Sequence, residues 1–343
     1  MKYRLLGNTG LAVSQMSYGA MTFGQGTMIA DVTNDTDQAA ADALVGTCLD
    51  AGVNFFDTAN AYRAGESEMM LGKALQGKRQ DVVIATKVGF RMSESINDRG
   101  GSAHHILRSA EGSLKRLGTD YIDLYFHHVP DAYTPLEETA QALTSLVKSG
   151  KVRYVGVSNY PAWMAQRLND LLGQEGISLA AAQMYYSLVG RDLEVDYVPF
   201  MEANKMGLMI WSPLASGFLT GKYTREQPTP EGGRRSGAFQ FPPVNVEKGY
   251  DVVDVLKEVA AAHDTSVASV SLAWLMSRPF ATNIIIGASK MHQLKDNLKA
   301  ATIELTEEQI TQLTEVSSWA VPNTYPGWFQ GMAKDAQLEE LLK

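Results

Sequence analysis

Ionisable side chains stand where short apolar segments of this sequence end. Asp57 and Lys87 each close such a segment, as do the adjacent His127 and His128. Tyr62 follows Asp57 by five residues. An ionisable group at the end of a buried strand is costly unless it is paired. If these segments are parallel strands that meet at one rim, Asp57 and Lys87 neutralise each other there.

Such a group of side chains is suited to polarising a carbonyl and delivering a proton to it. A phenol has an ordinary pKa of ~10, and an adjacent ammonium lowers that value by stabilising the phenolate. We therefore expect Lys87 to lower the pKa of Tyr62, while Asp57 holds Lys87 in place and protonated. A histidine would donate a second hydrogen bond to the substrate oxygen. The hydride that completes such a reduction must come from a cofactor.

Each of these residues also has a structural interpretation when it is taken alone. The Asp57–Lys87 pair is equally well explained as a salt bridge, and Tyr62 as a packed aromatic of a loop. The two histidines would then be one core residue and one exposed residue. The occurrence of all of them at the ends of successive strands favours the chemical interpretation.

Short apolar runs alternate with longer helical patterns along the chain. The predicted strands are Ser14–Tyr18, Asn54–Asp57, Val82–Lys87, Tyr121–His127, Val152–Ser158, Ala182–Met184, Leu208–Trp211 and Ile284–Ile286. The predicted helices include Thr36–Asp50, Glu68–Leu75, Ala103–Leu117, Leu136–Ser149 and Tyr250–His263. Eight alternating units of this kind favour an α/β fold, a (β/α)8 TIM barrel, over an open sheet. We expect residues 1–343 to form this one domain.

The doubly wound dinucleotide-binding fold is the main competitor in this class. It would show a G-x-G-x-x-G pattern between the first strand and the first helix. The nearest stretch, from Gly19 to Gly26, has a different spacing. The barrel is therefore the preferred prediction.

Strand alternation distinguishes the two histidines. The inside of a small barrel is filled by bulky apolar side chains, and successive residues of a strand point to opposite faces. His128 has the same parity as Leu124 and Phe126, whereas His127 has the parity of Tyr125. This pattern predicts that His128 points inward.

Three segments lie outside the strand–helix repeat. Tyr3–Leu11 is predicted to form a small N-terminal hairpin that plugs the bottom of the barrel. Tyr223–Lys248 and Ser317–Met332 are rich in Gly and Pro, as is typical of either functional loops or disorder. As long loops of the C-terminal face, the first would close over a cofactor and the second would line a substrate pocket. Otherwise they are a surface loop and a docking segment.

Bulk properties predict a soluble, cytoplasmic protein. Hydrophobic residues make up 45% and charged residues 20% of the chain, a globular composition. The net charge of −8 argues against nucleic acid as a partner. No apolar run is long enough for a membrane span, and no secretory signal is apparent. The single cysteine, Cys48, excludes an intrachain disulfide, and we expect no metal site.

Several long motifs resemble those of the aldo-keto reductase family. Residues 55–62 (FFDTANAY) and 65–68 (GESE) are similar to its first signature. Residues 121–125 (YIDLY), followed by His128-Val129-Pro130, are similar to its second. Residues 84–87, 156–159 and 211–214 are also family-like. The motifs occur in the right order over nearly the whole chain.

The resemblance implies NADP(H)-dependent, reversible reduction of an aldehyde or ketone. Its catalytic residues would be Asp57, Tyr62, Lys87 and His128, with Tyr62 as the general acid. The histidine that stands two residues before the proline is His128, in agreement with the alternation of the strand.

The resemblance also implies a nicotinamide-nucleotide site in three parts. The residues that would hold the nicotinamide carboxamide and stack on the ring are Ser158, Asn159, Gln183 and Trp211. The residues that would cover the pyrophosphate are Ser212, Leu214, Gly217 and Lys222. The residues that would hold the adenosine end are Gly287, Ser289, Lys290, Gln293, Asp296 and Asn297.

The adenosine end bears on the choice of cofactor. Many relatives place arginine there to grip the 2′-phosphate, where this sequence has Ser289 and Gln293 beside Lys290. The resemblance to the longer bacterial members of the family predicts NADP(H), with a weaker selectivity for the 2′-phosphate. NAD(H) is the alternative.

The substrate predicted is a small-molecule carbonyl compound, and the sequence leaves the oligomeric state open. The residues expected near its access route are Trp163, Tyr186, Arg191, Tyr325 and Trp328. Arg191 would either favour an anionic substrate or form a surface salt bridge. Two alternatives to a reductase are a nicotinamide-nucleotide-binding sensor or accessory subunit with negligible turnover, and a Schiff-base lyase that uses Lys87 as its nucleophile.

Overall fold

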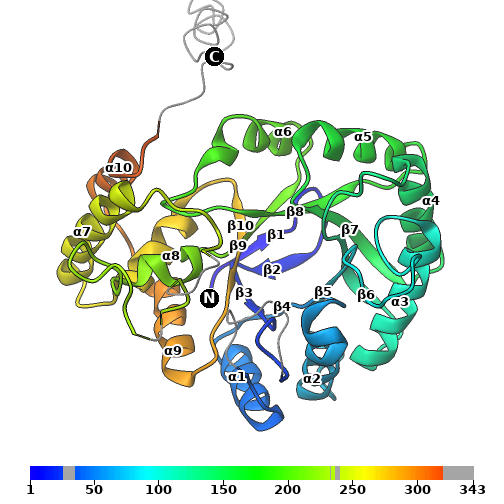
Figure 1. Cartoon of the computed structure of the whole chain (residues 1–343), viewed down its shortest axis with the longest axis horizontal. Helices are drawn as coiled ribbons and strands as arrows, with labels where there is room; N and C mark the ends of the chain where they lie inside the picture. Colours follow the sequence, from blue (N-terminus) through cyan, green and yellow to red (C-terminus); the bar gives the residue numbers. More distant parts are fainter. Residues whose placement is uncertain (26–34, 232, 236–239, 320–343) are drawn as a thin grey trace, which may run out of the picture.

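The computed structural model describes residues 1–25, 35–231, 233–235 and 240–319. Eight parallel strands close into a barrel, and helices surround it (Figure 1). The strands are β3 (Met16–Gly19), β4 (Phe55–Asp57), β5 (Val83–Val88), β6 (Ile122–His127), β7 (Val152–Ser158), β8 (Leu179–Tyr185), β9 (Gly207–Trp211) and β10 (Ala281–Ile286). They pair in chain order, and β10 pairs with both β9 and β3. The predicted (β/α)8 barrel is confirmed.

Most helices of the outer ring follow one strand and lead to the next. They are α1 (Gln38–Asp50), α2 (Glu66–Ala74), α3 (Ala103–Leu117), α4 (Leu136–Lys148), α5 (Ala162–Gly173), α6 (Tyr197–Ala203), α7 (Val246–Ala262), α8 (Val267–Ser277), α9 (Met291–Lys299) and α10 (Glu307–Val316). The five helices predicted from the sequence are all present. α3 has the predicted bounds because Ser102 caps its first turn and Gly118, with a φ of 66°, ends it.

Most strands lie within one residue of their predicted bounds, but β3, β8 and β10 differ from them by two or three residues at their start. Ser14 was expected to open the first barrel strand, but it ends a hairpin strand, and the barrel strand begins at Met16. β8 extends over Leu179–Tyr185, well beyond the predicted Ala182–Met184. Its first half is rich in alanine, which lacks the β-branched signal of a strand. Burial on both faces of the barrel wall overrides that weak propensity.

The apolar core has two layers on either side of the barrel wall. Side chains that point inward, among them Phe55, Val83 and Leu124, form the smaller inner cluster. Side chains of opposite parity, such as Phe56 and Ile84, pack outward against the helices. A strand covered on both faces in this way needs a continuous apolar run, which is the pattern that the sequence shows.

The predicted N-terminal hairpin is present and closes the end of the barrel at which the strands begin. β1 (Tyr3–Leu5) and β2 (Ala12–Ser14) pair in antiparallel fashion. Leu6, between them, is fully buried in the inner cluster. Gly7 has a φ of 57°, and a Cβ there would lie 2.4 Å from the carbonyl oxygen of Ala180. The hairpin therefore fits tightly against the first residues of β8.

Two further expectations concern membrane-spanning helices and the number of domains. Among the described residues, no helix is long and apolar enough to cross a bilayer. The expectation of one domain over residues 1–343 stays a prediction, since residues 320–343 lie outside the described residues.

Replacing Leu6 by alanine is expected to lower the free energy of unfolding by about 2–4 kcal/mol, because it leaves a cavity in the barrel floor. Denaturant unfolding followed by circular dichroism measures this change. The matched control is Leu5→Ala at the neighbouring position, where the side chain is 59% exposed and should contribute little. Equal losses in the two variants would contradict the role of the hairpin as a packed floor.

Candidate active site

The barrel brings four predicted catalytic residues together where its strands end. Asp57 is the last residue of β4, and Lys87 is the second-last residue of β5. Tyr62 begins a short 3-10 helix, η1 (Tyr62–Gly65), that follows β4, and His128 directly follows β6. The alternation of side chains along a strand explains why these residues meet. Ala85 lies two residues before Lys87, and Phe126 lies two residues before His128. Both belong to the inner cluster, so Lys87 and His128 also point into the barrel.

Lys87 is the centre of the site. Its ammonium is fully buried and donates hydrogen bonds to Asp57 Oδ1 at 2.6 Å and to the carbonyl oxygen of Thr58 at 2.7 Å. Its Nζ lies 3.3 Å from the hydroxyl of Tyr62. Three oxygen acceptors thus surround a cation that has no access to water. This arrangement fixes the ammonium beside the phenol.

Asp57 is held from the other side of the barrel. Gln183 Nε2 donates to Asp57 Oδ2 at 2.8 Å, and β8, which carries Gln183, is four strands from β4 in either direction. Both carboxylate oxygens therefore have a donor. The amide nitrogen of Gln183, predicted to hold a nicotinamide carboxamide, is engaged with Asp57 in this structure.

The charges of the pair are coupled. Burial raises the pKa of Asp57, while the attraction and hydrogen bonds of Lys87 and the hydrogen bond from Gln183 oppose that rise. Burial also disfavours the Lys87 ammonium, but its attraction to Asp57 and Tyr62 outweighs burial and raises its pKa. Lys87 is therefore protonated at neutral pH, as the sequence predicted.

The predicted effect of Lys87 on the pKa of Tyr62 is present, but it does not set the net direction of the shift. Burial is the largest influence and raises the pKa of Tyr62, and the carboxylate of Asp57 raises it further. Lys87 lowers the pKa through its charge and its hydrogen bond, as expected, but does not outweigh burial. The sequence revealed the neighbouring cation but not the loss of water around the phenol. The phenol of Tyr62 is therefore protonated at neutral pH.

His128 lies beside Tyr62 with the two rings edge to face, 5.8 Å between centroids. Its Nδ1 is buried and has no hydrogen-bond partner among the residues that the structure describes. Burial lowers the pKa of His128 well below its ordinary value, and the nearby charge of Lys87 lowers it further. The imidazole is therefore neutral at physiological pH and suited to donate one hydrogen bond, not a formal charge.

His127 points the other way, as strand alternation requires. Its Nδ1 forms a 2.5 Å hydrogen bond with the hydroxyl of Tyr160, and its ring is fully buried. Burial lowers the pKa of His127 to about 4. The side chain contacts Gly101 of the loop before α3, behind the barrel wall. His127 thus belongs to the packing of that loop.

Asn159 links three strand ends beside the catalytic cluster. Its Nδ2 donates at 3.0 Å to both the carbonyl oxygen of His128 and Ser158 Oγ, and its Oδ1 accepts from Trp211 Nε1 at 3.0 Å. Asn159 has a φ of 59°, a conformation that asparagine tolerates better than most residues. Ser158, Asn159 and Trp211 therefore form one connected group.

Aromatic rings already surround Trp211. Phe241, from the long segment after β9, stacks on it with 5.5 Å between centroids and 15° between planes. Tyr185, the last residue of β8, lies 5.2 Å away at a tilt of 37°. The segment 223–248 thus reaches the rim, where Ser216 Oγ donates to the carbonyl oxygen of Phe241 at 2.6 Å.

The residues predicted to cover a pyrophosphate follow β9 directly. Ser212 and Gly217 have positive φ values of 51° and 89°. Ser212 Oγ accepts from the backbone nitrogen of Ser216 at 3.1 Å. Leu214 is half-buried and Lys222 is exposed. A Cβ added to Gly217 would meet only open space, so the backbone there is accessible to a ligand.

The residues predicted for an adenosine end gather around the start of α9. Lys290 is its N-cap and provides no side-chain cap for the first amide groups of the helix. Asn297 Nδ2 lies 3.4 Å from the carbonyl oxygen of Gly287. Asp296 accepts from Ser266 Oγ at 2.5 Å. Ser289 and Gln293 are half-buried at the same end.

Two residues expected near the substrate are structural instead. Arg191 is buried, binds both carboxylate oxygens of Glu194 and donates to the carbonyl oxygen of Thr314 at 2.6 Å. Tyr186 is buried against Trp274. Their polar atoms are used inside the protein. Trp163 is 69% exposed. The other expected residues, Tyr325 and Trp328, lie outside the described residues.

Phe90 lines the site and was not singled out in the sequence. Its ring lies edge to face with that of His128, 4.7 Å between centroids, and remains 44% exposed. Its place three residues after Lys87, in the loop that follows β5, could have indicated a position beside the site. Phe90 gives the mouth of the site an apolar wall.

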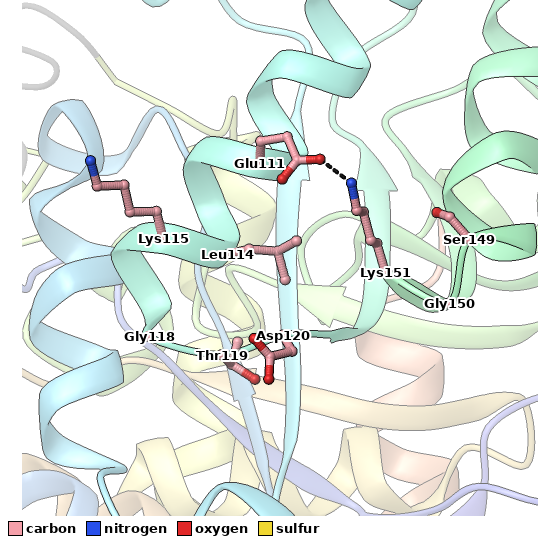
Figure 2. Close-up of a pocket in the computed structure, with 9 residues that line it drawn as sticks. All are labelled: Glu111, Leu114, Lys115, Gly118, Thr119, Asp120, Ser149, Gly150 and Lys151. Atoms are coloured by element: carbon pink, nitrogen blue, oxygen red, sulfur yellow. Dashed lines mark hydrogen bonds and ion pairs between the residues drawn. The ribbon is translucent and has the colours of Figure 1, made fainter.

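A surface groove of 630 Å³ lies at the other end of the barrel (Figure 2). It is lined by residues of the second half of α3 and by the residues that precede β6 and β7. Figure 2 shows Lys151 paired with Glu111 at its edge. In (β/α)8 enzymes the active site is at the opposite face, so the groove is not part of the candidate site.

The burial of His127 predicts a pH-dependent stability. The unfolded chain takes up a proton near the usual histidine pKa of ~6.5, whereas folded His127 does so only near 4. Between these values the unfolded state binds more protons, so this contribution is complete above ~6.5 and is lost as the pH falls. We expect its loss to reach about 2 kcal/mol between about pH 7 and about pH 5.

Chemical denaturation at the two pH values, in the wild type and in His127→Gln, measures this contribution. The variant should be less stable at neutral pH but should lose less stability on acidification. A decline of the same size in both proteins would show that His127 is not the titrating group.

Comparison with known proteins identifies the family. The family model "Aldo/keto reductase family" matches residues 15–318. The uncharacterized oxidoreductase YrpG of Bacillus subtilis (strain 168) is 37% identical over 328 residues, which cover 92% of this chain and 96% of that protein. The L-glyceraldehyde 3-phosphate reductase of Escherichia coli (strain K12) is 32% identical over 327 residues, 92% of each chain.

A third relative carries a different kind of name. A probable voltage-gated potassium channel subunit beta of Oryza sativa subsp. japonica is 37% identical over 338 residues, which cover 92% of this chain and 96% of that protein. The family match and the three relatives agree with the strand-end cluster and the barrel. This chain belongs to the aldo/keto reductase family.

Proposed function

We propose that this protein reduces an aldehyde or ketone to the alcohol, reversibly and with NADPH. The observation that carries the proposal is the buried Lys87 ammonium, which contacts Asp57 at 2.6 Å and the Tyr62 hydroxyl at 3.3 Å. His128 stands beside the same phenol. A proton donor, a cation that stabilises its conjugate base and a second hydrogen-bond donor thus share one site.

The chain's own residues handle the proton and the developing charge. Tyr62 is protonated at rest and donates its proton to the carbonyl oxygen as negative charge forms there. The phenolate left behind is stabilised by Lys87, whose charge lowers the pKa of Tyr62 against the effect of burial. A neutral His128 donates a hydrogen bond to the same oxygen. When bound, a nicotinamide cofactor supplies the hydride.

The described residues fit such a cofactor. The indole of Trp211 gives a flat surface next to the polar side chains of Ser158 and Asn159. Gly217 and Gly287 each have open space where a Cβ would stand, so backbone can approach a ligand closely. Exposed cations and an uncapped helix start suit the phosphates. These features support the assignment of the nicotinamide, pyrophosphate and adenosine parts given by the resemblance.

NADP(H) is the proposed cofactor because of the residues at the start of α9. Lys290 is exposed there, beside the half-buried Ser289 and Gln293. An ammonium at a helix N-terminus adds its charge to that of the helix dipole in attracting a 2′-phosphate. Lysine lacks the forked geometry of arginine, so NAD(H) is expected to bind as a weaker alternative.

The setting proposed is a cytoplasmic enzyme that acts on a small carbonyl compound, without nucleic acid or membrane as a partner. The relative named L-glyceraldehyde 3-phosphate reductase supports a carbonyl substrate. The exposed ring of Phe90 beside His128 suits substrates with an apolar group next to the carbonyl.

A second candidate function is that of an accessory subunit which binds a nicotinamide nucleotide with negligible turnover. The observation that favours it is the 37% identity to a protein named as a probable potassium channel subunit beta. The two candidates make opposite predictions for carbonyl-dependent oxidation of NADPH.

Tyr62→Phe is expected to lower kcat/KM for carbonyl reduction about 10²- to 10⁴-fold, because the proton donor is lost while the ring remains. NADPH oxidation over a panel of aldehydes and ketones measures the rate, and fluorescence titration should show unchanged NADPH affinity. Tyr133→Phe, at an 83% exposed position, is the matched control. An undiminished rate in Tyr62→Phe would rule out the reductase mechanism, and a wild type without turnover would favour the accessory subunit.

Lys290→Ala is expected to raise the KM for NADPH about five- to tenfold, because one charge-assisted contact to the 2′-phosphate is removed. The KM for NADH should change little, since that cofactor lacks the phosphate. Lys295→Ala, an exposed lysine one turn further along α9, is the control. A parallel rise for both cofactors in Lys290→Ala would place Lys290 elsewhere in the site.

A further inference from the structure

The first turn of α2 hydrogen-bonds to the outer faces of the two strand ends that carry Asp57 and Lys87. Ser67 Oγ lies 2.8 Å from Thr58 Oγ1 and donates to the carbonyl oxygen of Ala20 at 2.7 Å. Thr86 Oγ1 donates to Glu68 Oε1 at 2.5 Å. All these groups are buried. One helix turn therefore contacts both catalytic strands from behind.

The inner and outer contacts are two sides of the same strand ends. Thr58 follows Asp57, and Thr86 precedes Lys87. Because side chains alternate along a strand, the residues that face inward form the ion pair, and their neighbours face α2. A shift of α2 would therefore move the two strand ends that hold the ion pair.

Glu68 is fixed by two strong contacts. Its carboxylate is fully buried, and Arg116 of α3 donates from Nε to Glu68 Oε2 at 2.6 Å. The other oxygen accepts from Thr86. A buried carboxylate is tolerated only when its oxygens are paired in this way, and such charge-assisted bonds have strict geometry. Glu68 thus ties α2 to both α3 and β5.

Arg116 also supports the turn that carries Tyr62. A Cβ on Gly65, the last residue of η1, would lie 2.6 Å from Arg116 Cδ and 2.7 Å from its Nε. Arg63 and Ala64 have φ values of 52°, and Gly65 has a φ of 94°. Two consecutive non-glycine residues in the left-handed region are strained and persist only where the surroundings hold them. The Arg116 side chain packs directly against the end of that turn.

We propose that Ser67, Glu68 and Arg116, with Thr86, form a positioning network that sets the place of the Tyr62 hydroxyl relative to Lys87. The inference rests on the proposed reduction. These residues touch neither substrate nor cofactor, and they act through the turn and the two strand ends. The network gives a physical role to residues 65–68, the part of the first signature that the catalytic assignment leaves unexplained.

The geometry shows why such a network matters. The 3.3 Å between Lys87 Nζ and the Tyr62 hydroxyl is already at the long end of a hydrogen bond. A displacement of the phenol by about 1 Å would break this contact, and misplacements of that size lower rates by up to about 10². Lys87 also bonds to Asp57 and Thr58 at shorter distances, so a small displacement of the turn would affect its contact with Tyr62 first.

The test uses a pair of substitutions at Thr86 that differ in one hydroxyl. Thr86→Val keeps the shape but removes the bond to Glu68, whereas Thr86→Ser keeps the hydroxyl. We expect Thr86→Val to lower kcat about tenfold or more at unchanged NADPH affinity, and Thr86→Ser to stay within about twofold of the wild type. The alkaline limb of the pH–rate profile should move in Thr86→Val, since Lys87 would stabilise the phenolate less.

A destabilised but distant variant separates positioning from general stability. Leu6→Ala in the barrel floor should lower the melting temperature without changing kcat below that temperature. Hydrogen exchange of the amides of residues 62–66 should accelerate in Thr86→Val and in Glu68→Gln, but not in Leu6→Ala. This exchange needs no turnover, so it tests the network even if the wild type proves inactive, an outcome that would refute only the proposed function.

The proposal is overturned if Thr86→Val loses stability but keeps the wild-type kcat and pH profile. It is also overturned if Thr86→Ser loses as much activity as Thr86→Val, or if exchange at residues 62–66 is the same in all variants. A lower kcat that is rescued by serine, together with faster local exchange, supports it.

Discussion

The buried ion pair of Lys87 and Asp57 is the interaction on which the rest of the site depends. An ammonium without access to water is tolerated only if several acceptors replace the lost solvent. Here the acceptors are a carboxylate oxygen at 2.6 Å, a backbone carbonyl oxygen at 2.7 Å and a phenol at 3.3 Å. All three come from residues 57–62. The strand end and turn after β4 are therefore shaped around one cation on β5.

Closure of the barrel makes that arrangement possible. The register of β4 on β5 places Asp57 opposite Ala85, two residues before Lys87, so that the long lysine side chain meets the carboxylate at the rim. The second oxygen of Asp57 is held by Gln183 from the opposite wall. An open sheet would not bring a donor across in this way. The closed topology thus contributes directly to the charge balance of the site.

The charge of Lys87 lowers the pKa of both neighbouring groups, but it opposes the effect of burial at one and reinforces that effect at the other. It lowers the pKa of Tyr62, against the larger effect of burial, and it reinforces the effect of burial in lowering that of His128. Tyr62 therefore stays a neutral donor with a stabilised conjugate base, and His128 stays a neutral hydrogen-bond donor. The proposed roles, acid for Tyr62 and hydrogen-bond donor for His128, follow from the effect of the Lys87 charge on two different groups.

Much of the fold and of the candidate site could be predicted because the strands of a barrel have a strong local sequence pattern. Continuous apolar runs marked most strands, and alternation indicated that His128, not His127, points inward. Local pattern could not reveal the full length of β8, whose alanines are strand-forming only because they are buried. It also could not give the net shift of the pKa of Tyr62, which depends on how much water the folded chain excludes.

Contacts between residues that are distant in sequence could not be predicted either. Phe241 stacks on Trp211 from the long segment between β9 and α7, and Arg116 reaches Gly65 from the end of α3. Nothing in the spacing of these residues encodes their meeting. The sequence indicated which side chains are candidates for the chemistry, whereas the side chains that hold them in place emerge only from the folded arrangement.

The ion pair also bears on the choice between a reductase and an accessory subunit. A barrel that only binds a nucleotide needs a flat aromatic surface, polar groups for the amide and cations for the phosphates. It has no need of a buried ammonium beside a phenol, and replacing a buried ion pair by well-packed apolar residues is often neutral or stabilising. Apolar side chains such as Phe55 and Leu124 line much of the barrel interior. The free energy spent in burying Lys87 and Asp57 is best explained by the chemistry that this pair makes available to Tyr62.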